Sequence, residues 1–192
     1  MKLLTFVFAA ALVSAQGAFA SVIPYTANLT GGAEVPGNNS PGTGFADVIV
    51  NTVANTMQVV VTFTGLTGTT TGSHIHCCTT TPDVGNSGVA TTVPSFAGFP
   101  AGVTSGTYNQ TLDLTLASSY NPAFVSANGG NTAGAETALL AGMAADDSYL
   151  NIHTTAFPGG EIRGYLLASP EPATVLLTAS ALVGLAALRR KR

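Results

Sequence analysis

The sequence predicts an all-β protein, an antiparallel Greek-key-like sandwich or barrel, lying between two apolar chain ends. The middle of the chain is rich in Thr, Asn, Ser, Gly and Val and has no Trp, which favours strands and turns over helices. Several short segments there alternate apolar and polar residues, and Gly- and Pro-rich turns separate them. Both chain ends, in contrast, combine a continuous apolar run with basic residues.

The first 20 residues have the organisation of a secretory signal peptide. Lys2 supplies the positive start, residues 3–13 form the apolar stretch, and Ala18 and Ala20 flank Phe19 in the small-x-small pattern that signal peptidase cleaves. Residues 1–20 are therefore predicted to be removed, which leaves Ser21 as the mature N-terminus.

The first half of the remaining chain contains four predicted strands. Residues 25–29 form the first, and a Gly- and Pro-rich loop leads to the second at residues 45–50. Residues 57–63 alternate with period two, as expected for a strand with one buried side, and the short link 51–56 predicts an antiparallel hairpin with the preceding strand. A fourth strand is predicted over residues 73–78.

The second half adds three strands and a helix. Residues 112–116 alternate Leu with polar residues, which predicts a strand with its Leu face inward. Residues 137–145 have a helical pattern that ends at Asp146 and Asp147. Residues 149–153 and 161–167 are the last two strands, and the Pro- and Gly-containing loop 156–160 predicts a hairpin between them.

The C-terminal tail, residues 170–192, places a proline-rich triplet, an apolar run and a basic end in that order. Pro170, Glu171 and Pro172 precede sixteen uncharged residues, and Arg189 and Arg190 begin the basic end. A helix over residues 173–188 would be about 24 Å long, short for the ~30 Å core of a bilayer, and the positive-inside rule would keep the basic end in the cytoplasm. The tail resembles the PEP-CTERM sorting signal of Gram-negative bacteria, which implies processing by an exosortase on the way to the cell surface. An ordinary membrane anchor is the alternative.

The charge distribution excludes a nucleic-acid partner for the predicted exported domain, residues 21–169. Eight acidic residues lie in it against a single cation, Arg163, which gives about −7 with His neutral. It therefore lacks the basic surface that supplies most nucleic-acid affinity. Its length fits one domain with its own core.

Three segments of this domain resemble the CHRD domain, the module first named from chordin. They are residues 32–36 (Gly-Ala-Glu-Val-Pro), residues 73–76 (Ser-His-Ile-His) and residues 149–164, which include Phe-Pro-Gly-Gly-Glu-Ile-Arg-Gly. The resemblance runs from about Tyr25 to Leu167. It implies a β-rich extracellular domain, and it implies a fold and a compartment more firmly than an activity.

All three histidines lie in these segments and suggest a metal site. His74 and His76 project from the same face of a strand because side chains alternate, and His153 comes from another strand. If the strands are neighbours, three nitrogens could converge on Zn²⁺ or Cu²⁺, with Glu161, Asp83, Cys78 or water as fourth ligand. The alternative is that the three histidines bond to backbone and polar groups and hold the sandwich together without a metal.

Two further pairs are structural candidates. Arg163 is expected to form an ion pair with a carboxylate, either Glu161 on the same strand or the distant Glu34. Cys77 and Cys78 are the only cysteines, so a vicinal disulfide, an intermolecular bridge, thiolate ligation of a metal and buried free thiols all remain open.

The sequence contains no recognisable catalytic motif such as Gly-x-Ser-x-Gly or His-Glu-x-x-His. We therefore expect a non-enzymatic, exported protein of the cell surface or exopolysaccharide matrix. Signal peptidase and exosortase would process it, and the C-terminal helix would hold it in the membrane before sorting. A metal-binding or redox module is the alternative function.

Overall fold

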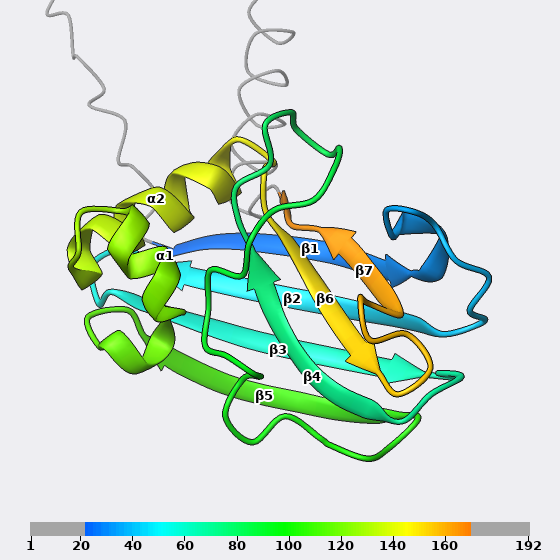
Figure 1. Ribbon diagram of the computed structural model, residues 1–192. Coiled ribbons are helices and arrows are strands. Elements are labelled where there is room, and N and C mark those ends of the chain that lie inside the picture. The colour runs from blue at the N-terminus through cyan, green and yellow to red at the C-terminus, as the bar shows by residue number, and fades with distance from the viewer. Residues whose placement is uncertain (1–21, 170–192) are drawn as a thin grey trace, which may run out of the picture.

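A computed structural model describes residues 22–169, and these residues form a mostly β structure around one antiparallel sheet (Figure 1). The strand order is β4-β6-β7-β1-β2-β3-β5, with β8 paired to β1. The strands are β1 (Val22–Thr30), β2 (Thr43–Asn51), β3 (Thr56–Thr64), β4 (Thr70–His76), β5 (Gly106–Asp113), β6 (Tyr149–Thr154), β7 (Ile162–Tyr165) and β8 (Leu167–Ala168).

The sheet curls on itself like a half-barrel, so the predicted sandwich or barrel is formed by one continuous sheet. Figure 1 shows β4 crossing in front of β2 and β3. Because successive side chains of a strand point to opposite faces, every second side chain points into the space that the curled sheet encloses. Ile75 of β4 and Leu150 of β6 join Val59 and Val61 of β3 in a single buried cluster.

The predicted hairpin between β2 and β3 is confirmed. Phe45 lies opposite Thr62, and the register continues without a shift to Asn51 opposite Thr56. Asn51 fixes the turn because its side-chain oxygen accepts hydrogen bonds from the amides of Val53 and Ala54.

The strand predicted at residues 112–116 is displaced, because β5 ends at Asp113. The Asp113 carboxylate accepts from the amide and hydroxyl of Thr115, which turns the chain away from the sheet. Leu114 is buried, but Leu116 is 52% exposed. Leu112 therefore lies at the end of β5, Leu114 and Leu116 belong to the turn that follows, and most of the strand precedes the leucines in a polar segment.

Two short helices close one end of the curled sheet (Figure 1). α1 (Pro122–Ala127) was not predicted, and α2 (Thr132–Ala144) begins ahead of the predicted residue 137. Asn131 caps α2 by accepting a hydrogen bond from the amide of Gly134. Leu139 and Met143 of α2 are fully buried and complete the core at this end.

No helix within residues 22–169 has the length and apolar character needed to cross a membrane. The predicted signal peptide with Ala18 and Ala20, the triplet Pro170-Glu171-Pro172 and the apolar helix with Arg189 and Arg190 lie outside the described residues.

Candidate metal centre

Polar and aromatic side chains cover the side of β4, β6 and β7 that points away from the core. Strand pairing arranges them in two rows that cross β4, β6 and β7. The first row is His76, Tyr149 and Tyr165, and the second is His74, Asn151 and Arg163. We call this set, together with His153, the covered face: His74, His76, Tyr149, Asn151, His153, Arg163 and Tyr165.

Two loops, residues 31–38 and 85–89, lie over the covered face. Asn86 joins them by donating a side-chain hydrogen bond to the carbonyl of Val35 at 2.9 Å. The second loop also accepts hydrogen bonds from below, because Tyr165 donates its hydroxyl proton to the carbonyl of Gly85. Buried polar groups require such partners, so the loops and the covered face stabilise one another.

The three histidines meet at the edge of the covered face. Nε2 of His74 lies 2.8 Å from Nε2 of His153, and the ring centroids of His74 and His76 are 4.8 Å apart. One ring nitrogen from each histidine lies within 4.8 Å of the other two. His74 and His76 are only 7% and 9% exposed. The pairing of β4 with β6 thus brings the three histidines together, as the sequence predicted for neighbouring strands.

Backbone carbonyls fix the tautomers of two of these rings. A carbonyl only accepts hydrogen bonds, so Nδ1 of His76 must donate to the carbonyl of Ser87, and Nδ1 of His153 to that of Pro158, both at 2.9 Å. The Nε2 atoms of both rings therefore carry lone pairs. Nε2 of His76 is buried and has no hydrogen-bond partner among the described residues.

Burial keeps all three imidazoles neutral. The pKa of His74 falls to about 3, because burial and the two neighbouring imidazoles disfavour the cation more than the carbonyl of Pro94 favours it. The pKa of His76 falls to about 4, chiefly through burial, and burial also lowers the pKa of His153. Neutral imidazole is the form that binds metal ions.

None of the carboxylates or sulfurs considered as a fourth ligand joins the three histidines within residues 22–169. The Glu161 carboxylate instead accepts hydrogen bonds from the Ser40 and Thr154 hydroxyls and from the amides of Thr67 and Gly68. Burial raises its pKa, but these four donors together hold the pKa below its usual value. Glu161 therefore ties the loops around β7 together.

Asp83 and Cys78 also lie outside the histidine cluster. Asp83 occupies a turn in which its amide donates to the carbonyl of Asp146. Cys78 forms a disulfide with Cys77, so its sulfur is not a free ligand. The two sulfurs approach the carbonyl of Ala138 in α2, and the expectation of Cys78 as a metal ligand does not fit this arrangement.

Arg163 pairs with Glu34 and not with Glu161. Its Nε lies 4.0 Å from the carboxylate of Glu34 and donates to the carbonyl of Ala33 at 2.6 Å, while its side chain is only 1% exposed. A second guanidinium nitrogen donates to Asn86 at 2.7 Å. The guanidinium carbon also lies 4.4 Å from the ring centroid of Tyr149, a favourable cation–π distance.

Glu34 is buried beside Asn151 and Gly160. Burial raises its pKa to about 7, against the opposing effects of the Arg163 charge and the Asn151 amide. Gly160 has φ of 135°, and a Cβ there would lie within 2.7 Å of Asn151 and Glu34. Only glycine lets the 156–160 loop pass this close.

Several residues of this site were not predicted from sequence patterns. Ser87 and Pro158 contribute only backbone carbonyls, which carry no side-chain signal. Tyr149 stacks on His76 with ring centroids 4.7 Å apart, and alternation along residues 149–153 could have placed it on the face of His153.

The chain was also compared with known proteins. No curated protein and no solved structure gave a significant match. Residues 25–166 match the sequence profile of the CHRD domain, a range that contains the three motif segments gathered around Arg163 and the histidines. The chain therefore belongs to the CHRD domain family.

Proposed function

We propose that this chain is an exported, non-enzymatic CHRD-domain protein that binds one divalent transition-metal ion, Zn²⁺ or Cu²⁺, through His74, His76 and His153. The proposal rests on the convergence of the three imidazoles from two paired strands. Histidine nitrogen is a good ligand for both metals.

The hydrogen bonds around the histidines support this role. Metal-bound histidines usually donate their second ring N–H to a carboxylate, carbonyl or water, which fixes ring orientation. His76 and His153 make this bond to the carbonyls of Ser87 and Pro158. A buried ring nitrogen without a hydrogen-bond partner costs stability, and Nε2 of His76 is such an atom among the described residues. A bound metal ion would give this nitrogen a partner, whereas a purely structural role for His76 would not.

Metal binding requires the three rings to move, because their nearest nitrogens now lie up to 4.8 Å apart and the more distant ones would have to approach one another. At Zn–N distances of about 2.0–2.1 Å, tetrahedral geometry separates two ligand nitrogens by about 3.3 Å. The Nε2 atoms of His74 and His153, now 2.8 Å apart, would move apart by roughly half an ångström. His74 would also transfer its Nε2 proton to Nδ1. Water or an external group would supply the fourth ligand.

Elemental analysis tests the metal site. The full-length chain, purified in detergent, should contain close to one Zn or Cu per molecule, and His76→Ala should lose it. Val53→Ala, at an exposed residue of the turn between β2 and β3, is the control and should retain the metal. Metal-free protein after incubation with either ion, or equal metal content in the His76→Ala variant, would contradict the proposal.

Export and sorting are proposed from the two chain ends. Signal peptidase would cleave after Ala20, and an exosortase would recognise Pro170-Glu171-Pro172 while the following helix holds the chain in the inner membrane. The domain would then reach the cell surface or the surrounding exopolysaccharide.

Replacing Glu171 tests the sorting step. Glu171→Ala should leave uncleaved protein in the inner membrane, whereas Thr174→Ala, just beyond the triplet, should be processed normally. Cell fractionation with mass spectrometry of the mature ends distinguishes the two, and normal processing of Glu171→Ala would rule out recognition through this triplet.

A further inference from the structure

A second part of the sheet surface, formed by β1, β2, β3 and β5, has exposed outward side chains in the described residues 22–169. The outward side chains of these strands alternate with the buried core residues. Their register places Asn28, Phe45, Thr62 and Thr107 in one row across the four strands. We call six exposed residues of this surface the open face: Asn28, Thr43, Phe45, Thr62, Thr64 and Thr107.

The polar groups of the open face are free to bind an external molecule. No hydroxyl of its four threonines, and no amide atom of Asn28, has a side-chain hydrogen bond within residues 22–169. Each threonine hydroxyl can both donate and accept. Strand spacing of about 4.8 Å and alternate-residue spacing of about 6.7 Å set these groups in a grid on the scale of a sugar ring.

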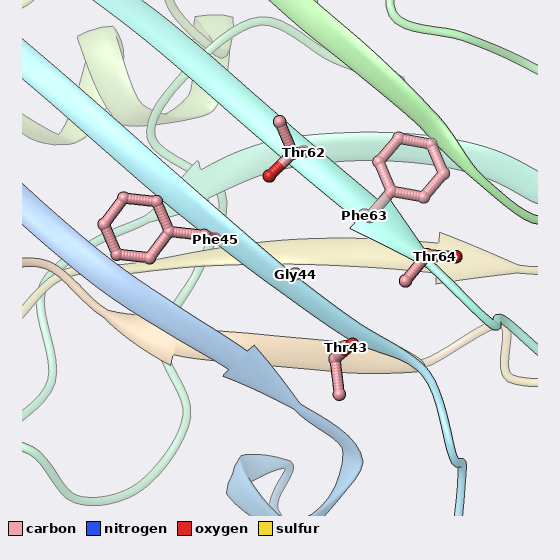
Figure 2. Close-up of a pocket in the computed structure, with 6 residues that line it drawn as sticks. All are labelled: Thr43, Gly44, Phe45, Thr62, Phe63 and Thr64. Atoms are coloured by element: carbon pink, nitrogen blue, oxygen red, sulfur yellow. The ribbon is translucent and has the colours of Figure 1, made fainter.

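An aromatic ring lies among these hydroxyls. Phe45 is 40% exposed, unusually so for a phenylalanine on a strand. Phe45 on β2 and Thr62 and Thr64 on the neighbouring β3 are among the residues that line an open depression of about 330 Å³. Figure 2 shows the ring of Phe45 extending from β2 on the side away from β3. A sugar ring has an apolar C–H face and a rim of hydroxyls, so the ring and the threonines complement both parts of it.

Charge restricts the class of ligand. Arg163 is the only cation between residues 22 and 169, and it is buried beneath the loops of the covered face. The surface of this region therefore carries only acidic charges, and it would repel an anionic polysaccharide. The row next to Phe45 contains one acid, Asp47, opposite Val60. All six residues of the open face are neutral.

We propose that the open face binds a neutral, extended polysaccharide, with a sugar ring stacked on Phe45 and its hydroxyls bonded to the threonines and Asn28. The binding surface deepens the proposed matrix role and is independent of the metal, because no histidine lies on these four strands. A second copy of the chain is the competing occupant.

Binding to defined glucans tests the proposal. The full-length chain in detergent is incubated with amorphous β-1,4-glucan, β-1,3-glucan and the polyanion alginate. We expect retention on at least one neutral glucan and none on alginate. Phe45→Ala should weaken binding about fivefold to tenfold through loss of apolar contact. Val84→Ala, an exposed apolar residue on the loop after β4, should bind as the wild type does.

The outcomes separate this proposal from the metal site. Removal of metal with EDTA should leave glucan binding unchanged, and the melting temperature of Phe45→Ala should match that of the wild type. Failure to bind either neutral glucan, equal binding by Phe45→Ala, or binding to alginate would overturn the proposal. So would a stable dimer in sedimentation that Thr62→Glu dissociates, because the second copy would then occupy the face.

Discussion

The covered face and the open face lie on the same outer side of one curled sheet, yet their side chains differ in kind. The covered face holds a buried arginine, three buried or half-buried histidines and a neighbouring buried glutamate, all beneath two loops. The open face holds hydroxyls, an amide and one phenylalanine in contact with solvent. Titratable groups gather where loops exclude water, and there their pKa values shift.

This difference separates two roles within one domain. Desolvated groups with fixed partners suit a site that selects one small ion, because burial makes each hydrogen bond costly to lose. Free hydroxyls on a flat surface suit a large neutral partner that brings its own hydroxyls. The comparison predicts that substitutions on the covered face cost stability, whereas those on the open face affect only binding.

Removal of the buried cation should have the largest effect. Arg163→Met leaves Glu34, the carbonyl of Ala33 and the Asn86 side chain without their donor. Breaking a buried pair in this way typically costs about 3–5 kcal/mol. Urea denaturation at pH 7 measures the free energy of unfolding, and a loss below about 1 kcal/mol would show that the loops tolerate an uncharged side chain there.

Glu34 should give the domain an unusual pH dependence. Its pKa is raised to about 7 in the folded state from 4.5. Between pH 4.5 and about 7, Glu34 therefore keeps its proton in the folded chain but has lost it in the unfolded chain. This difference stabilises the folded state at low pH. The contribution of Glu34 to the free energy of unfolding, up to about 3 kcal/mol, is fully present below pH 4.5 and is lost as the pH rises through about 7.

Glu34→Gln removes this titration while keeping the side-chain shape. Denaturation of both proteins from pH 4.5 to 8 should show the wild type losing stability relative to the variant as pH rises. The lowered pKa values of the histidines act in the opposite direction in both proteins, so the difference isolates Glu34. Parallel curves would show that Glu34 titrates normally.

The sequence allowed some of this arrangement to be predicted. Alternation located β3 because this strand buries one face, and it placed His74 and His76 together because they are two residues apart on one strand. β5 was misplaced because its residues are polar and largely exposed, so burial left little pattern. α2 was shortened because its first turns are Thr, Ala and Gly, with little apolar periodicity.

Contacts between distant segments could not be read in the same way. His153 reaches His74 only through the pairing of β4 with β6, which depends on how the whole sheet curls. The role of Glu161 was missed for a similar reason, since the amides of Thr67 and Gly68 that bind it belong to a distant loop. The spacing of two residues suggested that Glu161 and Arg163 lie on one strand and form an ion pair. In the structure, however, Glu161 lies just before β7, which begins at Ile162.

Metal binding should stabilise the covered face by a smaller amount than Arg163 does. An ion that binds only the folded chain adds about 2.7 kcal/mol at one hundred times its dissociation constant. Thermal unfolding with and without ZnCl₂ should therefore show a higher melting temperature in the wild type and in Phe45→Ala. His76→Ala should show no shift, and an equal shift in that variant would place the ion elsewhere.

The smallest effect on stability is expected from the open face. Thr62 is exposed, forms no side-chain hydrogen bond within the described part of the chain and lies opposite Phe45 on the neighbouring strand. Thr62→Ala should change the free energy of unfolding by no more than about 0.5 kcal/mol, as is usual for surface positions. The same variant should weaken retention on the neutral glucan, because a donor and acceptor is lost beside the stacked sugar. Urea denaturation and glucan binding of one preparation measure both. A loss of stability comparable to that of Arg163→Met would mean that the open face supports the fold, and the division between the two faces would then be wrong.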